Sequence, residues 1–246
     1  MSKNNKAAAQ RSPYFATSRN YSDAVDAEFA FFKGLLAAKD HIRGFSANPS
    51  LQTALKQVAA FLIDQGQPLN IVVQFSVTDP RSKHKHTLLL GTQLEPPKPK
   101  CHPLVSHFLC LADADSFLTK VHADFDFHAD AEEKKPSPHI QMGGRVPTSL
   151  LKHCASSQPK VCWNEKMDKP RLPSLPVCTA LLWHWAFLEY SRDEQASDFL
   201  NAHHWKQLVK AAEATVLRPY FADGLHLMDN KPASDLLSAL YVPLSK

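Results

Sequence analysis

The chain has 246 residues, of which 44% are hydrophobic and 21% are charged, with a formal net charge of +4 at pH 7. These values are ordinary for a globular protein with a packed core, and they exclude a low-complexity or fibrous chain. Its 18 prolines and 7 glycines form neither a G-x-G-x-x-G nor a G-x-x-x-x-G-K-[ST] pattern, so no dinucleotide site or P-loop is expected.

The first residues, MSKNNKAAAQRS, are polar and lack the apolar segment of a signal peptide. The most apolar run, VCTALLWHWAFLEY, is too short and too polar to span a bilayer. The 5 cysteines show no paired spacing, which fits a reducing compartment better than a disulfide framework. We therefore expect a cytoplasmic protein with no membrane partner.

Residues 1–20 are expected to form a mobile N-terminal segment, followed by a single α+β domain over residues 21–246. Apolar residues at helical spacing predict one helix over 22–43 and a second that runs from Asn48 or Ser50 to Asp64. The apolar period then changes to two. This change predicts two strands joined by a turn with Asp79-Pro80, over 69–77 and 85–94.

A proline-rich connection over 95–103 leads to an apolar run at 104–111, and a short helix is expected near 113–120. Two further strands, 121–129 and 138–143, are expected to pair as a hairpin around an acidic-basic turn. Residues 148–176 are expected to be irregular. Three helices are expected after them, over 177–191, 202–217 and 233–241. This order of elements indicates an α+β fold, with a mostly antiparallel sheet that has a central hairpin and is covered by N-terminal and C-terminal helices.

The hairpin carries a row of ionisable residues. Because side chains alternate between the faces of a strand, one face of the first arm collects His122, Asp124, Asp126 and His128. If the apolar faces of both arms align, His139 and Gln141 join this row. The row has two interpretations: a solvated sheet face, or a site. Aspartate is depleted in strands, and sequences break local rules most often where function requires it, which favours the site.

The chemistry of this row predicts metal-assisted catalysis. Asp124 and Asp126 would hold a divalent metal, Mg²⁺ or Mn²⁺, because hard oxygen ligands suit these ions, and His122 and His128 would be flanking ligands. His139 would act as a general acid or base, or as a further ligand. The remaining candidates would contact the phosphate of a substrate: Gln141, Arg145, Arg81 and Lys85.

Two other groups of residues suggest alternatives. The segment RSKHKH, residues 81–86, satisfies the R-x-x-x-x-H pattern of some metal-independent ribonucleases, with Arg81 and Lys85 supplying charge and His84 or His86 moving protons. It predicts cleavage that resists EDTA. The segment CHPLVSHFLC offers two cysteines and two histidines, but their spacing is not that of a zinc knuckle.

The D-x-D of Asp124 and Asp126, followed by the S-x-H of Ser137 and His139, partly resembles the patterns of the polymerase β-like nucleotidyltransferases and of the archaeo-eukaryotic primases, which carry out metal-dependent nucleotidyl transfer. Over about residues 120–190, the motifs DFD, PSPHIQ, RVP or RLP, and LLWHWAFLEY together resemble an uncharacterised family of bacterial proteins met among mobile-element and defence genes. That family implies no established activity.

The sequence thus leads to three hypotheses of function. The first is metal-assisted phosphodiester or nucleotidyl chemistry on a nucleic acid or nucleotide, in a bacterial defence or toxin–antitoxin setting. The second is a non-catalytic interaction protein, an antitoxin-like or defence-complex subunit, whose polar hairpin face binds a protein or RNA. The third is a metal-independent ribonuclease centred on residues 81–86.

Overall fold

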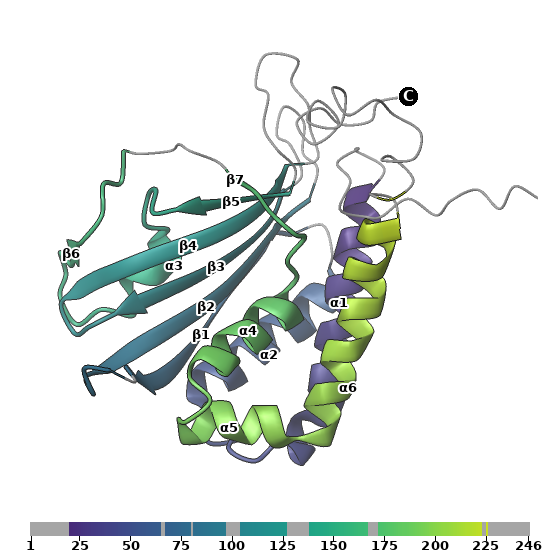
Figure 1. Cartoon of the computed structure of the whole chain (residues 1–246), viewed down its shortest axis with the longest axis horizontal. Helices are drawn as coiled ribbons and strands as arrows, with labels where there is room; N and C mark the ends of the chain where they lie inside the picture. Colours follow the sequence, from purple (N-terminus) through teal and green to yellow (C-terminus); the bar gives the residue numbers. More distant parts are fainter. Residues whose placement is uncertain are drawn as a thin grey trace, which may run out of the picture.

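A computed structural model describes residues 20–64, 67–79, 81–96, 104–126, 138–166 and 172–222, together with residue 225. A twisted sheet carries a layer of helices from both ends of the chain on one face (Figure 1). The expected α+β class, with a mostly antiparallel sheet, is confirmed. The helix expected over 233–241 lies outside the described residues.

The first helices pack an apolar stripe against the sheet. α1 (Asn20–Ala38) ends in a 3₁₀ turn, η1 (Lys39–His41), and α2 (Pro49–Ile63) follows and packs against the first strand. The side chain of Asn48 caps α2, because its Oδ1 accepts a hydrogen bond from the backbone N of Leu51 at 3.0 Å. Proline fits the next position, where no N–H is needed. The buried stripe of α2 has helical spacing: Leu51, Ala54, Leu55, Val58 and Phe61.

In the described part of the chain the sheet has seven strands, in the order β1-β2-β3-β4-β5-β7, with β6 pairing in parallel with β4. The other neighbours are antiparallel, so the four long strands form a meander. The strands are β1 (Leu69–Thr78), β2 (Lys85–Glu95), β3 (Leu104–Ala112), β4 (Ser116–Asp126), β5 (His139–Met142), β6 (Lys160–Val161) and β7 (Leu172–Pro173). The predicted hairpin of β4 and β5 is confirmed, and Asp124 pairs with His139 in its register.

The prediction of a short helix near 113–120 is wrong. The chain turns tightly at Asp113, whose backbone N donates to the carbonyl of Ser116 at 2.8 Å, and β4 then runs without interruption to Asp126. The polar residues of LADADSFLTK suit the start of a helix. Pairing with β3 and the complete burial of Phe117 in the sheet outweigh this local preference.

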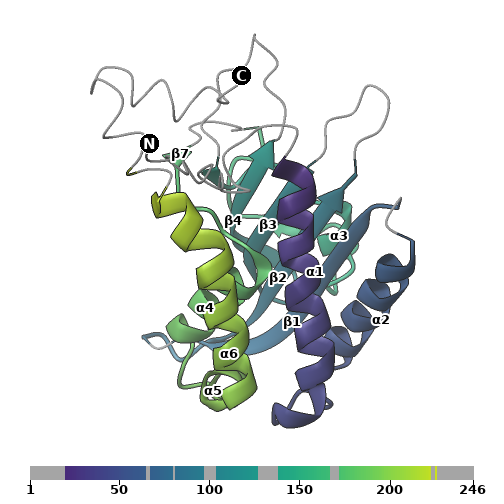
Figure 2. The same cartoon turned by 90° about the vertical axis from the view of Figure 1, so that its right-hand side faces the viewer.

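Among the residues that the structure describes, three helices follow the sheet: α4 (Thr179–Glu189), α5 (Glu194–Asn201) and α6 (His203–Ala212), which continues into a π-helical turn, η2 (Glu213–Leu217). The helices predicted over 177–191 and 202–217 are confirmed. The sequence did not indicate α5, nor the short α3 (Thr148–Leu151), β6 and β7 within the region expected to be irregular. Figure 2 shows α1, α4 and α6 in front of the sheet.

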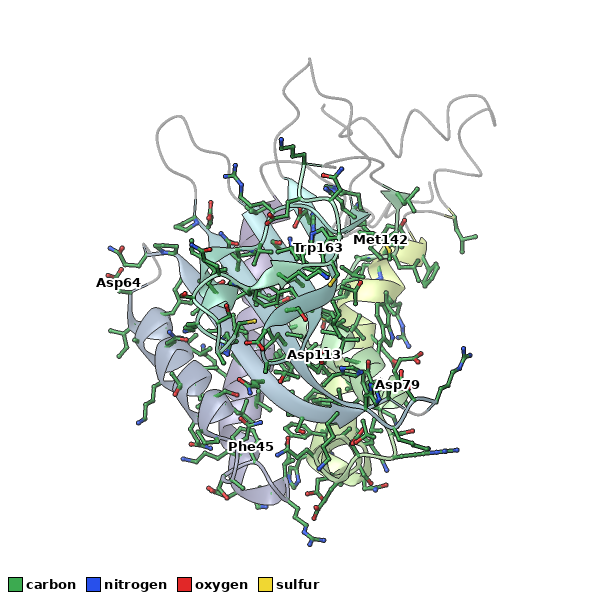
Figure 3. All side chains as sticks on the ribbon, turned by 90° about the vertical axis from the view of Figure 1, so that its left-hand side faces the viewer. Phe45, Asp64, Asp79, Asp113, Met142 and Trp163 are labelled. Carbon is green, nitrogen blue, oxygen red and sulfur yellow. The ribbon has the colours of Figure 1, made fainter. Side chains whose placement is uncertain are left out.

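Each face of the sheet has its own core. The larger core lies under the helices and contains a group of aromatic side chains in mutual contact, among them Phe75, Trp183, Phe187, Phe199 and Trp205. The smaller core lies on the other face and is covered by α3 and the segment that carries Trp163 (Figure 3). It contains Val72, Leu89, Phe108, Phe117 and Leu150. Both faces of the sheet are therefore partly covered. The layer of α1, α2, α4, α5 and α6 lies on one face, and α3 with the segment that carries Trp163 lies on the other.

Side chains protect the exposed edge of β1. The backbone N of Gln74 donates to Ser50 Oγ at 2.8 Å, and its carbonyl accepts from Asn48 Nδ2 at 2.9 Å. Further along, the carboxylate of Asp193 accepts from the backbone N of Thr78 at 3.1 Å. Unpaired edge groups invite association with other strands, and these bonds reduce their number.

Candidate functional site

The polar row of the hairpin lies on the face away from the helical layer. Ala123 and Phe125 of β4 are buried, and Phe125 belongs to the core under the helices. His122 and Asp124 alternate with them and so point to the other face. The register places Gln141 opposite His122 and His139 opposite Asp124. Four of the residues that the sequence placed in one row therefore share one face.

This row is not a solvated sheet face. The side chain of Asp124 is 21% exposed and that of His122 is 11% exposed. His139 and Gln141 are almost fully buried, at 1% and 2%. Polar groups taken out of water to this extent must be satisfied by partners or by a ligand.

Asp124 is the centre of the cluster. Its Oδ1 accepts a hydrogen bond from Ser106 Oγ at 2.5 Å, across the β3–β4 pair. Its Oδ2 lies 3.2 Å from His122 Nε2 and 3.8 Å from His139 Nε2. One carboxylate thus contacts a hydroxyl and two imidazoles, and the three strands β3, β4 and β5 position these groups. We call Ser106, His122, Asp124, His139 and Gln141 the Asp124 cluster.

The surroundings of Asp124 favour its charged form. Burial acts to raise its pKa, but the hydrogen bond and charge of His122 outweigh this effect, together with the hydrogen bond from Ser106 and the charge of His139. The result is a pKa of about 2, below the ordinary value of 3.8. Asp124 is therefore a carboxylate throughout the physiological range and can orient imidazole rings.

His122 has one ring nitrogen that the cluster leaves without a partner. Its Nε2 meets Asp124, but its Nδ1 is buried, and no described residue is hydrogen-bonded to it. Gly144 lies beside this ring: a Cβ built on Gly144 would stand 3.6 Å from His122 Cε1 and 3.4 Å from Gln141 Nε2. An oriented imidazole with one uncommitted nitrogen is the form that general acid–base catalysis uses.

Two glycines bend the chain over the cluster after β5. Gly143 and Gly144 have φ values of +81° and +75°, in the left-handed region that other residues rarely adopt. The bend is held by Gly143 N, which donates to the carbonyl of Lys120 at 2.7 Å, and by Trp163 Nε1, which donates to the carbonyl of Gly144 at 2.7 Å.

Two cations lie next to the bend. Lys120 is 6% exposed, and its Nζ donates to the carbonyl of Arg145 at 3.0 Å, whereas Arg145 itself is exposed. The sequence analysis identified Arg145 but not Lys120 or Ser106. Lys120 has the same parity as His122 and Asp124 in β4, so the period-two pattern could have found it. Ser106 is brought in by strand pairing and gives no local signal.

The structure does not describe the rest of the predicted metal set. Asp126 is the last residue of β4, and its side chain lies outside the described part, as does all of His128. Among the side chains that are described, no three from His, Cys, Asp and Glu are arranged to hold a metal ion. The roles given to Asp126 and His128 stay predictions.

The alternative candidates of RSKHKH lie elsewhere, around the tip of the β1–β2 hairpin and the β3–β4 turn. His86 Nδ1 and Asp113 Oδ1 are 2.7 Å apart, and the rings of His84 and His86 have centroids 6.5 Å apart. Figure 3 shows Asp79 and Asp113 in this part of the molecule, apart from Met142 of β5. The structure does not bring Arg81 or Lys85 into contact with the Asp124 cluster.

His107, from the segment CHPLVSHFLC, has a structural role. It faces the helical layer, where its Nε2 lies 2.9 Å from Glu28 Oε1, and both side chains are 0% exposed. Cys110, three residues further along β3, belongs to the smaller core on the other face. These two residues therefore cannot share a metal ion, and Cys101 and His102 lie outside the described residues.

Comparison with models of protein families, with curated proteins and with solved structures finds no match to this chain. Among the described residues, no helix combines the length and the apolar character needed to cross a membrane. The geometry of the Asp124 cluster and of the hairpin tip is therefore the basis for inferring a function.

Proposed function

We propose that this protein is an enzyme that cleaves or transfers phosphodiester bonds in a nucleic acid or nucleotide, with the Asp124 cluster as its acid–base centre. One observation carries the proposal: a single ionised carboxylate contacts two imidazoles at 3.2 and 3.8 Å in a largely buried row, and one of these rings retains an uncommitted nitrogen. Reactions at phosphate need a proton taken from the nucleophile and a proton given to the leaving oxygen.

The parts have distinct roles in this proposal. Asp124 fixes the ring of His122 through Nε2 and leaves Nδ1 for the proton exchange, as in other carboxylate–imidazole pairs. Nδ1 is buried, so the bend at Gly144 beside the ring has to yield for a substrate to reach it. His139 is the second imidazole and serves the opposite proton transfer. Arg145, exposed at the bend, supplies positive charge to the phosphate from the solvent side. The low pKa of Asp124 keeps its charge available to stabilise a protonated imidazole.

The proposal includes a divalent metal ion at Asp124. The described side chains do not by themselves form a three-ligand metal site, so the metal depends on the predicted ligand Asp126 beside Asp124. Both Mn²⁺ and Mg²⁺ are therefore tested, with Mn²⁺ preferred if imidazoles are among the ligands. A further oxygen donor at Asp126 would shift this preference towards Mg²⁺. Experiment can separate the role of the metal ion from that of the acid–base residues, because EDTA removes the metal ion and leaves the side chains unchanged.

The test is a cleavage and nucleotidyl-transfer screen on RNA, DNA and nucleotides, with Mn²⁺, Mg²⁺ or EDTA. The purified protein is compared with Asp124→Asn and His122→Gln, and with His203→Gln as a control, since His203 is an exposed histidine at the start of α6. We expect each cluster variant to lower turnover at least about 100-fold, and the control to retain it. Thermal unfolding verifies that all variants are folded.

Two outcomes would contradict the assignment of the function to the Asp124 cluster. EDTA-resistant RNA cleavage that survives Asp124→Asn but is lost in His86→Gln would place the centre at the hairpin tip, as a metal-independent ribonuclease. The absence of any turnover, with the variants folded, would favour the interaction-protein hypothesis, in which the cluster face binds a partner without chemistry.

A further inference from the structure

An open groove of about 550 Å³ lies at the end of the sheet away from Asp124. It is lined by residues 83–87, from the hairpin tip and the start of β2, and by residues 112–114, from the end of β3 and the turn that follows. The Asp124 cluster lies eight residues along β4 from Ser116, which corresponds to roughly 26 Å of strand. The groove is therefore a separate feature of the surface.

The lining of the groove is rich in cationic and titratable nitrogen groups. Lys83, His84, Lys85 and His86 all line it, against one carboxylate, that of Asp113. One oxygen of this carboxylate lies 2.7 Å from His86 Nδ1 and so orients the imidazole ring. The contact also leaves His86 Nε2 as the ring nitrogen that can meet a ligand. Lysines and an oriented imidazole around a concave surface suit a phosphate group.

Lys83 occupies its place against its own backbone preference. Its φ is +62°, which makes it the one non-glycine residue with a positive φ in the described part of the chain. Glycine or asparagine adopts this conformation more readily than lysine. The hairpin holds it, because the backbone N of Lys83 donates to the carbonyl of Asp79 at 3.0 Å. A positive φ is common for a residue that closes a hairpin loop, and here it fixes the direction in which Lys83 leaves the tip.

We propose that this groove binds a phosphate group of single-stranded RNA. In this way it would dock the strand that the Asp124 cluster acts on, so this reading of its purpose rests on the function proposed above. By strand alternation, Lys85 and Thr87 share the face of Leu89, which is also the face of the Asp124 cluster. The groove and the Asp124 cluster therefore lie on the same side of the sheet, which α3 and the segment that carries Trp163 partly cover, so an RNA strand that joins them would pass over this cover.

The experiment measures binding separately from turnover. Fluorescence anisotropy follows a labelled single-stranded RNA of about 12 nucleotides titrated with the full chain, in EDTA. Lys83→Asn removes the charge and suits the positive φ, so we expect RNA affinity to fall about five- to tenfold while thermal stability is unchanged or higher. Lys206→Asn, at an exposed lysine of α6, is the matched control and should bind as the wild type does.

The outcomes separate this inference from the proposed function. Asp124→Asn should bind RNA normally even where it abolishes turnover. Equal RNA affinity in the wild type and Lys83→Asn, or an equal loss in Lys206→Asn, would overturn the inference. Competition by inorganic phosphate and by AMP distinguishes the source of the phosphate: if either displaces the RNA at the concentration at which RNA itself binds, the groove is a site for small phosphates and the RNA assignment is wrong.

Discussion

The buried pair of Glu28 and His107 gives the sharpest stability prediction. Glu28 Oε1 lies 2.9 Å from His107 Nε2, and it also accepts a hydrogen bond from the backbone N of Thr179 at 3.1 Å. Thr179 is the first residue of α4, whose N-cap residue, Cys178, makes no side-chain cap. A carboxylate from α1 thus caps α4 and joins it to β3.

The substitution to make is Glu28→Gln, which keeps the shape but removes the charge. An amide oxygen at the Oε1 position can still accept both bonds, but less strongly than a carboxylate. The NH₂ group then takes the Oε2 position, 3.4 Å from the backbone N of Thr179, where the carboxylate had an acceptor. Hydrogen bonds to a charged acceptor are stronger than those to a neutral one by about 1 kcal/mol each, and a buried donor set against another donor costs about 1–3 kcal/mol. We therefore expect the free energy of unfolding to fall by about 3–5 kcal/mol. That is a large share of the 5–15 kcal/mol typical of a domain.

Urea unfolding at neutral pH measures the effect, with tryptophan fluorescence as the probe because Trp183 and Trp205 are buried in this core. Glu194→Gln is the control: Glu194 lies 4.0 Å from Arg43, and both side chains are more than 80% exposed. An exposed pair contributes little, so this variant should unfold as the wild type does. A Glu28→Gln protein within 1 kcal/mol of the wild type would refute the cap and the buried pair as stabilising features.

Three further predictions concern the sheet. Because the pKa of Asp124 is lowered to about 2, its charge stabilises the fold above about pH 4, and this stabilisation is lost as the pH falls towards 2. Asp124→Asn should therefore lower the free energy of unfolding by about 2 kcal/mol at pH 7 and by little at pH 2, as measured by urea titrations at both pH values. Gly91→Ala should cost about 3 kcal/mol or prevent folding, as seen by thermal unfolding, because its Cβ would stand 1.9 Å from the buried ring of Phe108. Asp193→Ala should cost about 1 kcal/mol in urea, because it leaves the backbone N of Thr78 without its acceptor.

The sequence predicted the elements whose pattern is local. The period of two in β4 placed His122 and Asp124 on one face, and the structure confirms this placement. The capped apolar stripe of α2 was equally clear. By contrast, residues 113–120 were predicted as a helix because their local composition suits one. Pairing with β3, which the local pattern does not include, makes them a turn and the start of β4.

The partners that complete each cluster could not be predicted, since they come from distant parts of the chain. Ser106 meets Asp124 only because β3 and β4 pair in one particular register. Glu28 meets His107 and Thr179 across 79 and 151 residues of sequence. Nothing in the neighbourhood of these residues distinguishes them from ordinary helix and strand positions, so only the three-dimensional packing reveals their roles.

The two faces of the β3–β4 pair therefore carry two kinds of imidazole–carboxylate contact. On the helical face, both side chains of the Glu28 and His107 pair are fully buried, and the carboxylate is used to cap α4; such an arrangement needs no ligand to explain it. On the other face, Asp124 is 21% exposed, it caps no helix, and it lies 3.2 and 3.8 Å from two imidazoles. The buried Nδ1 atoms of His107 and His122 both lack a described partner, so this feature does not separate the two contacts. The partial exposure of Asp124, its second imidazole and the absence of a capped helix are the reasons to look for chemistry at Asp124 and not at Glu28.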